Sequence, residues 1–199
     1  MTKLHFIYGT MGCSKTAQAL IRRFNYIENG KKVLLLKPKI DNRDGINIIK
    51  SRIGIEAVAL TFSHNDNIID LYEKEIKEVD CIIIDEVNFA TPSQVEEMRT
   101  IVDQYHVPVF AYGLKANFKS LLFEGSKRLF ELADIHTFLE SICQCGNNTI
   151  VNARYQDNKI IYEGDLIVIG GNDKYINLCY DCWKKGKFKK KAIKKEKKH

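Results

Sequence analysis

The residues best suited to carry chemistry form a loop near the start of the chain, Gly9-Thr10-Met11-Gly12-Cys13-Ser14-Lys15-Thr16. The loop follows an apolar stretch, opens a helical pattern, and matches most of the pattern G-x-x-x-x-G-K-[ST]. In such a loop, backbone N–H groups and the helix N-terminus bind phosphates. Lys15 would reach the β- and γ-phosphates, and the Thr16 hydroxyl would hold Mg²⁺. We therefore predict that residues 9–16 bind ATP and Mg²⁺.

Ser14 stands where this pattern has its second Gly. Glycine lets a backbone come close to a phosphate, so a Cβ here is expected to crowd the β-phosphate or to shift the loop. Gly12, two residues earlier, is able to absorb that strain. Taken alone, the loop leaves two interpretations open: a phosphate loop, and an ordinary strand–turn–helix with Lys15 in solvent.

Two adjacent carboxylates follow a buried-type strand in Ile82-Ile83-Ile84-Asp85-Glu86. Downstream of a phosphate loop, this is the Walker-B arrangement, in which Asp85 would hold Mg²⁺ through water. Transfer of a phosphoryl group to an alcohol also needs a base that takes up the hydroxyl proton, and Glu86 is our candidate. The plainer alternative is a polar strand end, but it becomes weaker because two independent motifs occur on the expected elements.

Asp41 and Arg43 come just after the second expected strand, which points at the same edge of the sheet. Arg43 could pair with Glu86 or contact a transferred phosphate. Considered in isolation, both residues are ordinary surface charges.

Four cysteines occur as two close pairs, Cys143-Gln144-Cys145-Gly146 and Cys179-Tyr180-Asp181-Cys182. Four thiolates suit a closed tetrahedral Zn²⁺ site, which would be structural because every ligand position is filled. The first pair has the tighter spacing C-x-C. The alternative is a set of free thiols in a reducing compartment.

Apolar stretches alternate with helical patterns through the first 140 residues. This order predicts an α/β fold, with a mostly parallel sheet covered by helices on both faces. The expected strands are 4–8, 33–36, 81–84, 108–111 and 135–139, and the expected helices are 15–28, 68–77, 93–105 and 127–132.

The pattern changes after Glu140, where residues 149–155 and 159–162 predict a β-hairpin around Asp157-Asn158. A piece of this size is too small to hold a core alone and needs a staple. We therefore divide the chain into a nucleotide-binding domain (1–140), a zinc-stapled subdomain (141–183) and a Lys-rich tail (184–199).

The formal net charge of +6 is concentrated in the tail, which has ten Lys and one Glu, so that residues 1–183 carry about −3. A nucleic-acid reader should show a basic face on its fold, so nucleic acid is an unexpected partner except through a disordered tail. The sequence shows no signal peptide and no apolar run that could span a membrane, so we expect a cytoplasmic protein without a membrane partner.

These motifs together resemble the thymidine kinase family of the zinc-containing, cellular type, over nearly the whole chain to about Trp183. Asp85-Glu86-Val87-Asn88-Phe89 is similar to the family's D-E-x-Q-F, with Asn for Gln. The other matching segments are Asp41-x-Arg43, Ser51-Arg52-Ile53-Gly54, Tyr112-Gly113-Leu114-Lys115-Ala116-Asn117-Phe118, and Val168-Ile169-Gly170-Gly171-Asn172-Asp173-Lys174-Tyr175 followed by Cys179-x-x-Cys182. The C-x-C-G form of the first cysteine pair occurs in a bacterial branch of the family.

The resemblance implies a P-loop (RecA-like) fold and transfer of the γ-phosphate of ATP to the 5′-hydroxyl of thymidine or deoxyuridine. Glu86 would be the base, with Arg43 beside it and the phosphates. A loop around 166–175 would close over the base. The base would be surrounded by Met11, Phe89, Leu114, Phe118, Val168, Gly170, Gly171 and Tyr175. The family is commonly a homotetramer inhibited by dTTP.

Two other functions stay open at this point. Because Ser14 replaces a glycine, the chain could be a catalytically weak relative that binds nucleosides or nucleotides. It could also bind nucleic acid through the cysteine module and the tail, which would make binding fall steeply with salt.

Overall fold

The computed structural model describes residues 2–164 and 174–188. Val168, Gly170 and Gly171, which we expected near the base, lie outside the described residues, as does the tail from residue 189. None of the helices in the described ranges is long and apolar enough to cross a membrane.

The main sheet has six parallel strands in the order β5-β2-β6-β7-β1-β8. Their bounds are β1 (Leu4–Gly9), β2 (Val33–Pro38), β5 (Leu60–Phe62), β6 (Cys81–Ile84), β7 (Val109–Leu114) and β8 (Ile135–Leu139). All four residues of β6 are buried, as expected for a central strand with helices on both faces.

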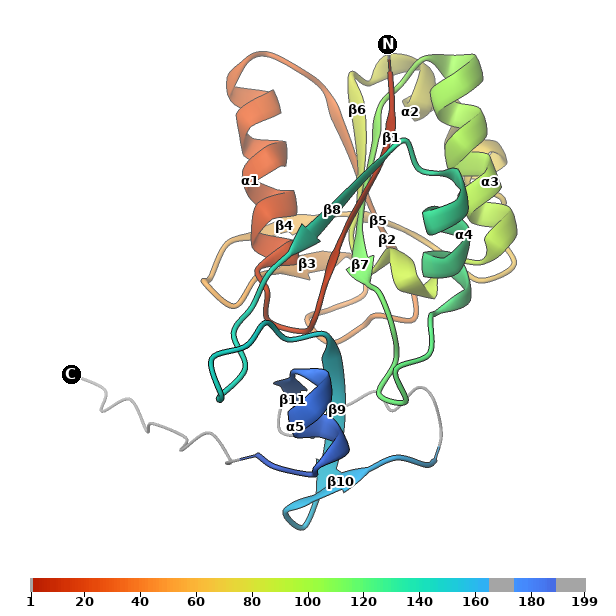
Figure 1. The fold of residues 1–199 in the computed structure, drawn as a ribbon. Coiled ribbons are helices and arrows are strands. Elements are labelled where there is room, and N and C mark those ends of the chain that lie inside the picture. Colours follow the sequence, from red (N-terminus) through yellow and green to blue (C-terminus); the bar gives the residue numbers. More distant parts are fainter. Residues whose placement is uncertain (1, 165–173, 189–199) are drawn as a thin grey trace, which may run out of the picture.

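Helices cover both faces of this sheet (Figure 1). Helix α1 (Lys15–Glu28) lies on one face, whereas α2 (Ile68–Glu78), α3 (Pro92–Thr100) and α4 (Glu124–Leu132) lie on the other. Alternate residues of β6 face the two cores: Ile82 and Ile84 pack in the core under α2, α3 and α4, while Ile83 packs in the core under α1. Full burial of an aliphatic side chain contributes about 1.5–3 kcal/mol, so this sheet has ample apolar support.

The start of α3 follows directly from its sequence. The Thr91 side chain accepts a hydrogen bond from Gln94 N–H, and the Gln94 side chain accepts one from Thr91 N–H, which is a capping box. Pro92 occupies the first helical position, where its missing N–H costs nothing. The chain continues as a π-helical segment, η2 (Ile101–Tyr105), so the helical region reaches the residue that we expected.

Two antiparallel sheets complete the fold. One is the pair β3 (Ile48–Lys50) and β4 (Glu56–Val58). The other, called the small sheet here, has the order β10-β9-β11 and lies beyond the carboxyl end of β7 (Figure 1). It consists of β9 (Val151–Gln156), β10 (Lys159–Ile161) and β11 (Tyr175–Leu178), followed by helix α5 (Tyr180–Lys184).

The predicted α/β fold with a β-rich appendage is confirmed, and each predicted helix and strand of the first 140 residues overlaps an observed one. No strand was predicted at β3, β4, β5 or β11, which have three or four residues each. Segments this short carry too few alternating positions to show a strand period.

Candidate active site

A cleft of about 770 Å³ lies at the carboxyl ends of the main strands and collects most of the predicted site residues. Among its lining residues are Met11, Gly12, Ser14, Lys15, Thr16, Arg43, Glu86, Phe89, Leu114, Phe118 and Tyr175. The other predicted members described, Gly9, Thr10, Cys13 and Asp85, are buried and do not line the cleft. Residues from both ends of the chain therefore meet at one place.

The phosphate loop connects β1 to α1 and contains two left-handed residues. Gly12 has φ 73° and Ser14 has φ 68°. Such a conformation costs an L-residue roughly 1–2 kcal/mol but suits glycine, which explains why the general pattern has Gly at the second of these positions. Ser14 thus accepts backbone strain while the loop keeps a conformation typical of glycine.

Lys15 is buried within the loop that precedes it. Its Nζ donates to the Thr10 carbonyl at 2.7 Å and lies 3.5 Å from both the Gly9 carbonyl and Cys13 Sγ. The ammonium is therefore placed inside the curve of the loop and not in solvent, which removes the plain strand–turn–helix interpretation.

Asp85 follows β6 and lies beneath the loop. Its Oδ1 atom is buried and has no hydrogen-bond partner among the residues that the structure describes, while the Thr16 hydroxyl bonds to this carboxyl. Burial, and then the adjacent Glu86 carboxylate, raises the pKa of Asp85 to about 7. A hydroxyl next to a carboxylate oxygen without a partner is an oxygen donor set that fits Mg²⁺.

Arg43 bridges Glu86 and a second carboxylate, that of Asp41. Arg43 donates from Nη2 to Glu86 Oε1 and from Nε to Asp41 Oδ1, both at 2.6 Å. Although burial opposes it, the Glu86 and Asp41 carboxylates raise the pKa of Arg43, which stays protonated. Glu86 itself has φ 52°, a strained conformation of the kind that collects at functional sites. The predicted contact between Arg43 and Glu86 is present.

Aromatic side chains also line the cleft. Phe89 ends the short helix η1 (Val87–Phe89) and meets Phe123 edge-on, with ring centroids 5.8 Å apart. Phe118 lies under the Arg154 guanidinium at 4.9 Å, and Tyr175 opens β11. These side chains provide the flat apolar surface that a nucleobase would require.

Asn88 ties η1 to the end of β7. Its Oδ1 accepts the Leu114 N–H at 2.9 Å. The two segments come so close that a Cβ on Gly113 would lie 2.9 Å from the Asn88 nitrogen, which is why this position needs glycine. The shorter side chain in place of the family's Gln thus has a definite role: it holds Phe89 next to Leu114.

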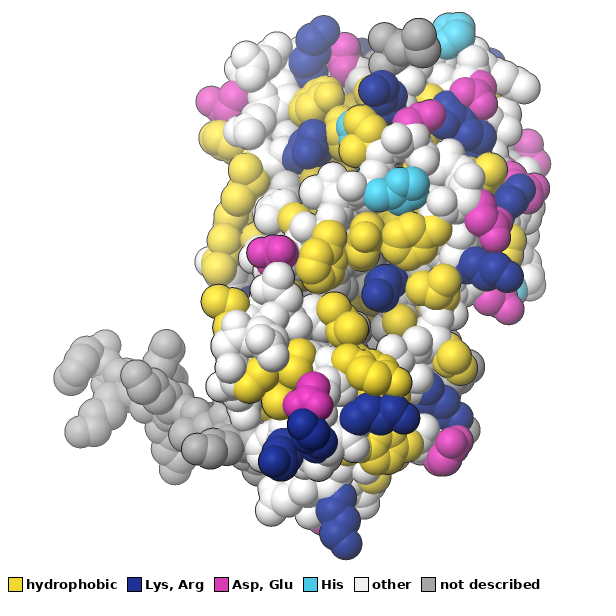
Figure 2. Space-filling view, in the orientation of Figure 1, with side chains coloured by type: hydrophobic (Ala, Val, Ile, Leu, Met, Phe, Trp, Pro, Cys, Tyr) yellow, Lys and Arg dark blue, Asp and Glu magenta, His cyan; other side chains and the backbone are white. Residues whose placement is uncertain are grey.

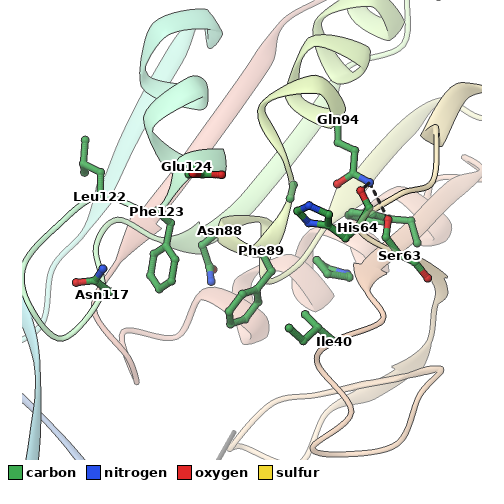
Figure 3. Close-up of a pocket in the computed structure, with 13 residues that line it drawn as sticks. Ile40, Ser63, His64, Asn88, Phe89, Gln94, Asn117, Leu122, Phe123 and Glu124 are labelled. Atoms are coloured by element: carbon green, nitrogen blue, oxygen red, sulfur yellow. Dashed lines mark hydrogen bonds between the residues drawn. The ribbon is translucent and has the colours of Figure 1, made fainter. Parts of the chain in front are cut away.

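A smaller pocket of about 270 Å³ adjoins the cleft (Figure 3). It shares Ile40, Phe89, Asn117 and Phe123 with the cleft. In Figure 3, Phe89 lies between Phe123 and His64, so it contributes to the walls of both cavities. Gln94 Nε2 donates to the Ser63 carbonyl at 2.8 Å, which attaches the far wall to α3.

The four cysteines of the two pairs converge beside the small sheet. The Sγ atoms of Cys143, Cys145, Cys179 and Cys182 all lie within 4.8 Å of one another, and Cys145 Sγ is 3.6 Å from Cys179 Sγ. Zn–S bonds of about 2.3 Å in a tetrahedron place sulfur atoms roughly 3.8 Å apart. The arrangement therefore fits a structural Zn²⁺.

Three residues near the loop had received no role from the sequence. Arg52 lies over the loop, since a Cβ on Gly12 would be 3.0 Å from its Nη1. Asn152 and Asn177 contact Met11 from the small sheet. The sequence does mark Asn152 as a polar residue between the apolar Val151 and Ala153 in an expected strand. The structure shows that all three residues are buried.

Comparison with known proteins agrees with this geometry. The family model for thymidine kinase matches residues 2–183. The thymidine kinase of Rhodopirellula baltica is 38% identical over 182 residues, which cover 90% of this chain and 86% of that protein. The thymidine kinase of Enterobacteria phage T4 is 40% identical over 186 residues, or 92% and 96% of the two chains.

A thymidine kinase of Streptococcus pyogenes is 39% identical over 180 residues, which cover 90% of this chain and 95% of that protein. Among solved structures, a Pif1 helicase from Candida albicans matches 69% of this chain and 36% of the helicase, with a TM-score of 0.42 at 15% identity, which is too low to bear on fold or function. The match to the family model and the extent of identity to these kinases establish that this chain belongs to the thymidine kinase family.

Proposed function

We propose that this protein is a thymidine kinase that transfers the γ-phosphate of ATP to the 5′-hydroxyl of thymidine or deoxyuridine, in the salvage of pyrimidine deoxynucleosides. The observation that carries the proposal is the meeting of Lys15 and Glu86 in a cleft that also has aromatic lining residues, with Asp85 buried beside Glu86 and Thr16. Phosphate-binding groups, carboxylates and a surface for a base are what this reaction needs.

The phosphate loop would bind the ATP phosphates through its backbone N–H groups, with Lys15 moving from the Thr10 carbonyl to the β- and γ-oxygens. Thr16 and Asp85 would hold Mg²⁺, which supplies neutralisation of phosphate charge when bound. The remaining predicted loop residues shape this backbone and need not contact the nucleotide through their side chains.

Glu86 would accept the proton of the 5′-hydroxyl while the 5′-oxygen bonds to the γ-phosphorus and the bond to the bridging oxygen of ADP breaks. Arg43 would hold Glu86 in place through the 2.6 Å contact to Oε1. Such pairing limits the rotation of the carboxylate and fixes the direction in which it points, which a base requires.

Thymine would lie among Met11, Phe89, Leu114, Phe118 and Tyr175, where flat apolar surfaces are available. Coverage of the base by Val168, Gly170 and Gly171 stays a prediction, as do the three-part division of the chain, inhibition by dTTP and a cytoplasmic location. The proposed homotetramer requires apolar contact surfaces, and Ile21, Phe24 and Ile27 of α1 are exposed. Figure 2 shows hydrophobic side chains in a row along the left edge of the molecule.

The experiment that tests the proposal is formation of dTMP from thymidine and Mg-ATP by the purified protein, with deoxycytidine and deoxyadenosine as parallel substrates. We expect turnover that is selective for thymidine. Folded, zinc-bound protein that binds thymidine without forming dTMP would instead favour the catalytically weak relative. That alternative is not favoured, because thymidine kinases match this chain at 38–40% identity over 90% or more of its length.

A further inference from the structure

Two asparagines of the small sheet hold both polar groups of one residue in the phosphate loop. Asn152 on β9 and Asn177 on β11 are directly paired across the strands. Asn152 Oδ1 accepts the Met11 N–H at 2.7 Å, and Asn177 Nδ2 donates to the Met11 carbonyl. Met11 is therefore fixed from a different sheet from the one that carries its loop.

Asn152 also connects the loop to the aromatic lining of the cleft. Its Nδ2 donates to the Ala116 carbonyl at 3.1 Å, between Leu114 and Phe118. The side chain is 4% exposed, and a buried amide is costly unless it is hydrogen-bonded. The buried Asn152 amide therefore requires its hydrogen bonds to the Met11 N–H and the Ala116 carbonyl.

The residue before Met11 is held by a cluster of three hydroxyls. Thr10 Oγ1 lies 2.8 Å from Ser141 Oγ and 2.9 Å from Thr149 Oγ1, and the last two also contact each other. Ser141 and Thr149 flank the turn that carries Cys143 and Cys145, and Thr149 N–H donates to the Ser141 carbonyl at 2.8 Å. Two successive loop residues are consequently attached to the cysteine-bearing module.

This attachment bears on the strain at Ser14. A non-glycine residue persists in the left-handed region only where the surrounding structure over-determines it. The loop around Ser14 is held at Thr10 and Met11 by side chains from the small sheet and its approach. Without these bonds, the loop would be free to relax toward a conformation in which Ser14 is less strained.

We infer that Asn152 and Asn177 are positioning residues for the phosphate loop: by clamping Met11, they hold the loop in the shape that binds nucleotide. The small sheet therefore controls nucleotide affinity, in addition to any part it has in covering the nucleoside. The inference rests on the proposed function only in naming ATP as the loop's ligand, because the clamp itself is a property of the folded chain.

The test uses the full-length, zinc-loaded protein and the variant Asn177→Ala, with Asn177→Gln as the conservative variant that keeps an amide. Asn148→Ala is the matched control, since Asn148 lies in the same module but donates to Glu140 Oε1 at 3.0 Å instead of to the loop. Amide hydrogen exchange of residues 9–16, the KM values and kcat, and the melting temperature are measured for each protein.

For Asn177→Ala we expect faster exchange in residues 9–16, about a five- to ten-fold rise in KM for Mg-ATP, a smaller change in kcat, and a melting temperature close to wild type. Asn177→Gln should recover part of the affinity, and Asn148→Ala should resemble wild type. Loop exchange and KM that do not change in Asn177→Ala would overturn the clamp. So would a uniform loss of kcat that accompanies general loss of protection in the small sheet.

Failure of the proposed function would look different. If the wild-type protein forms no dTMP but residues 9–16 still lose protection in Asn177→Ala, the clamp stands and the kinase activity does not. If the wild-type protein is active but hydrogen exchange in residues 9–16 does not change in Asn177→Ala, the kinase activity stands and the clamp does not.

Discussion

The main sheet and the small sheet solve the same problem of stability by different means. The main sheet buries whole strands between two layers of helices, and its two cores draw on residues from most of its elements. The small sheet has a core of only a few residues, which include Cys143, Cys179 and Trp183, and one compact group of four thiols. Burial of apolar surface is enough for the first, while a core as small as the second is expected to need a cross-link, which the four thiols fit.

The region with the smaller core nevertheless contacts the phosphate loop of the region with the larger one. The two carboxylates after β6 and the phosphate loop are at the edge of the main sheet, yet Thr10 and Met11 of that loop bond to side chains on the side of the small sheet. A strained loop gains its shape from outside its own sheet. The main sheet thus has the larger core and carries the phosphate loop, while the small sheet supplies side chains that contact this loop.

The largest expected effect separates chemistry from stability in the main sheet. Glu86→Gln removes the proposed base, so turnover of thymidine should fall about 10²- to 10⁴-fold, while the melting temperature stays near wild type. Steady-state formation of dTMP is the measurement. Glu75→Gln, an exposed change on α2, is the control and should keep full activity. Near-normal turnover in Glu86→Gln would remove Glu86 from this role.

The next effect breaks the small sheet alone. Cys179→Ser removes one of the four thiolates, and we expect loss of bound zinc with a destabilisation of the small sheet by several kcal/mol. Metal content and hydrogen exchange resolved by region would report it, with the main strands still protected. Cys81→Ala, which changes a cysteine of β6 outside the group of four, is the control, and this variant should retain the bound zinc. Unchanged metal content and an unchanged melting curve in Cys179→Ser would contradict the staple.

A smaller effect measures the strain in the loop. Ser14→Gly should stabilise the protein by about 0.5–1 kcal/mol, because relief at φ 68° outweighs the added flexibility of the unfolded chain. Turnover should change by less than about threefold, which corresponds to under 1 kcal/mol. Ser120→Gly, at φ 63°, is a matched control for stability away from the phosphate loop. A large gain in turnover in Ser14→Gly alone would show that Ser14 impairs the loop.

The smallest effect is a dependence on pH in the main sheet. Although burial opposes it, hydrogen bonds from Leu4 N–H and Arg99 lower the pKa of Asp134. A carboxyl whose pKa is lowered by folding stabilises the protein at pH values above its pKa in the unfolded chain, which is about 4. This contribution is lost as the pH falls through its pKa in the folded protein. The side chain is 38% exposed, so the contribution should be under about 1 kcal/mol. Denaturant unfolding of wild type and Asp134→Asn should converge below pH 4; a constant difference would contradict it.

Much of the fold was accessible from sequence because its signals are local. The strands of the main sheet are short apolar runs, and α3 begins at a capping box written in consecutive residues. The three-residue strands β3, β4 and β5 were missed because their pairing partners, and not their own residues, make them strands. Asn88 was noticed only as a departure from the family, since its bond to Leu114 joins residues that are distant in sequence.

The sequence by itself determined the phosphate loop, the two carboxylates after β6 and the four cysteines, because these motifs depend on residue types at close spacing. Only the tertiary structure decided which of its two predicted partners Arg43 contacts, that Lys15 folds into its own loop, and that Asn152 and Asn177 bind Met11. Hydrogen bonds between distant residues follow from how whole elements pack, and no local pattern records them. The parts of the site can therefore be recognised separately in the sequence, and packing of the two sheets brings them together.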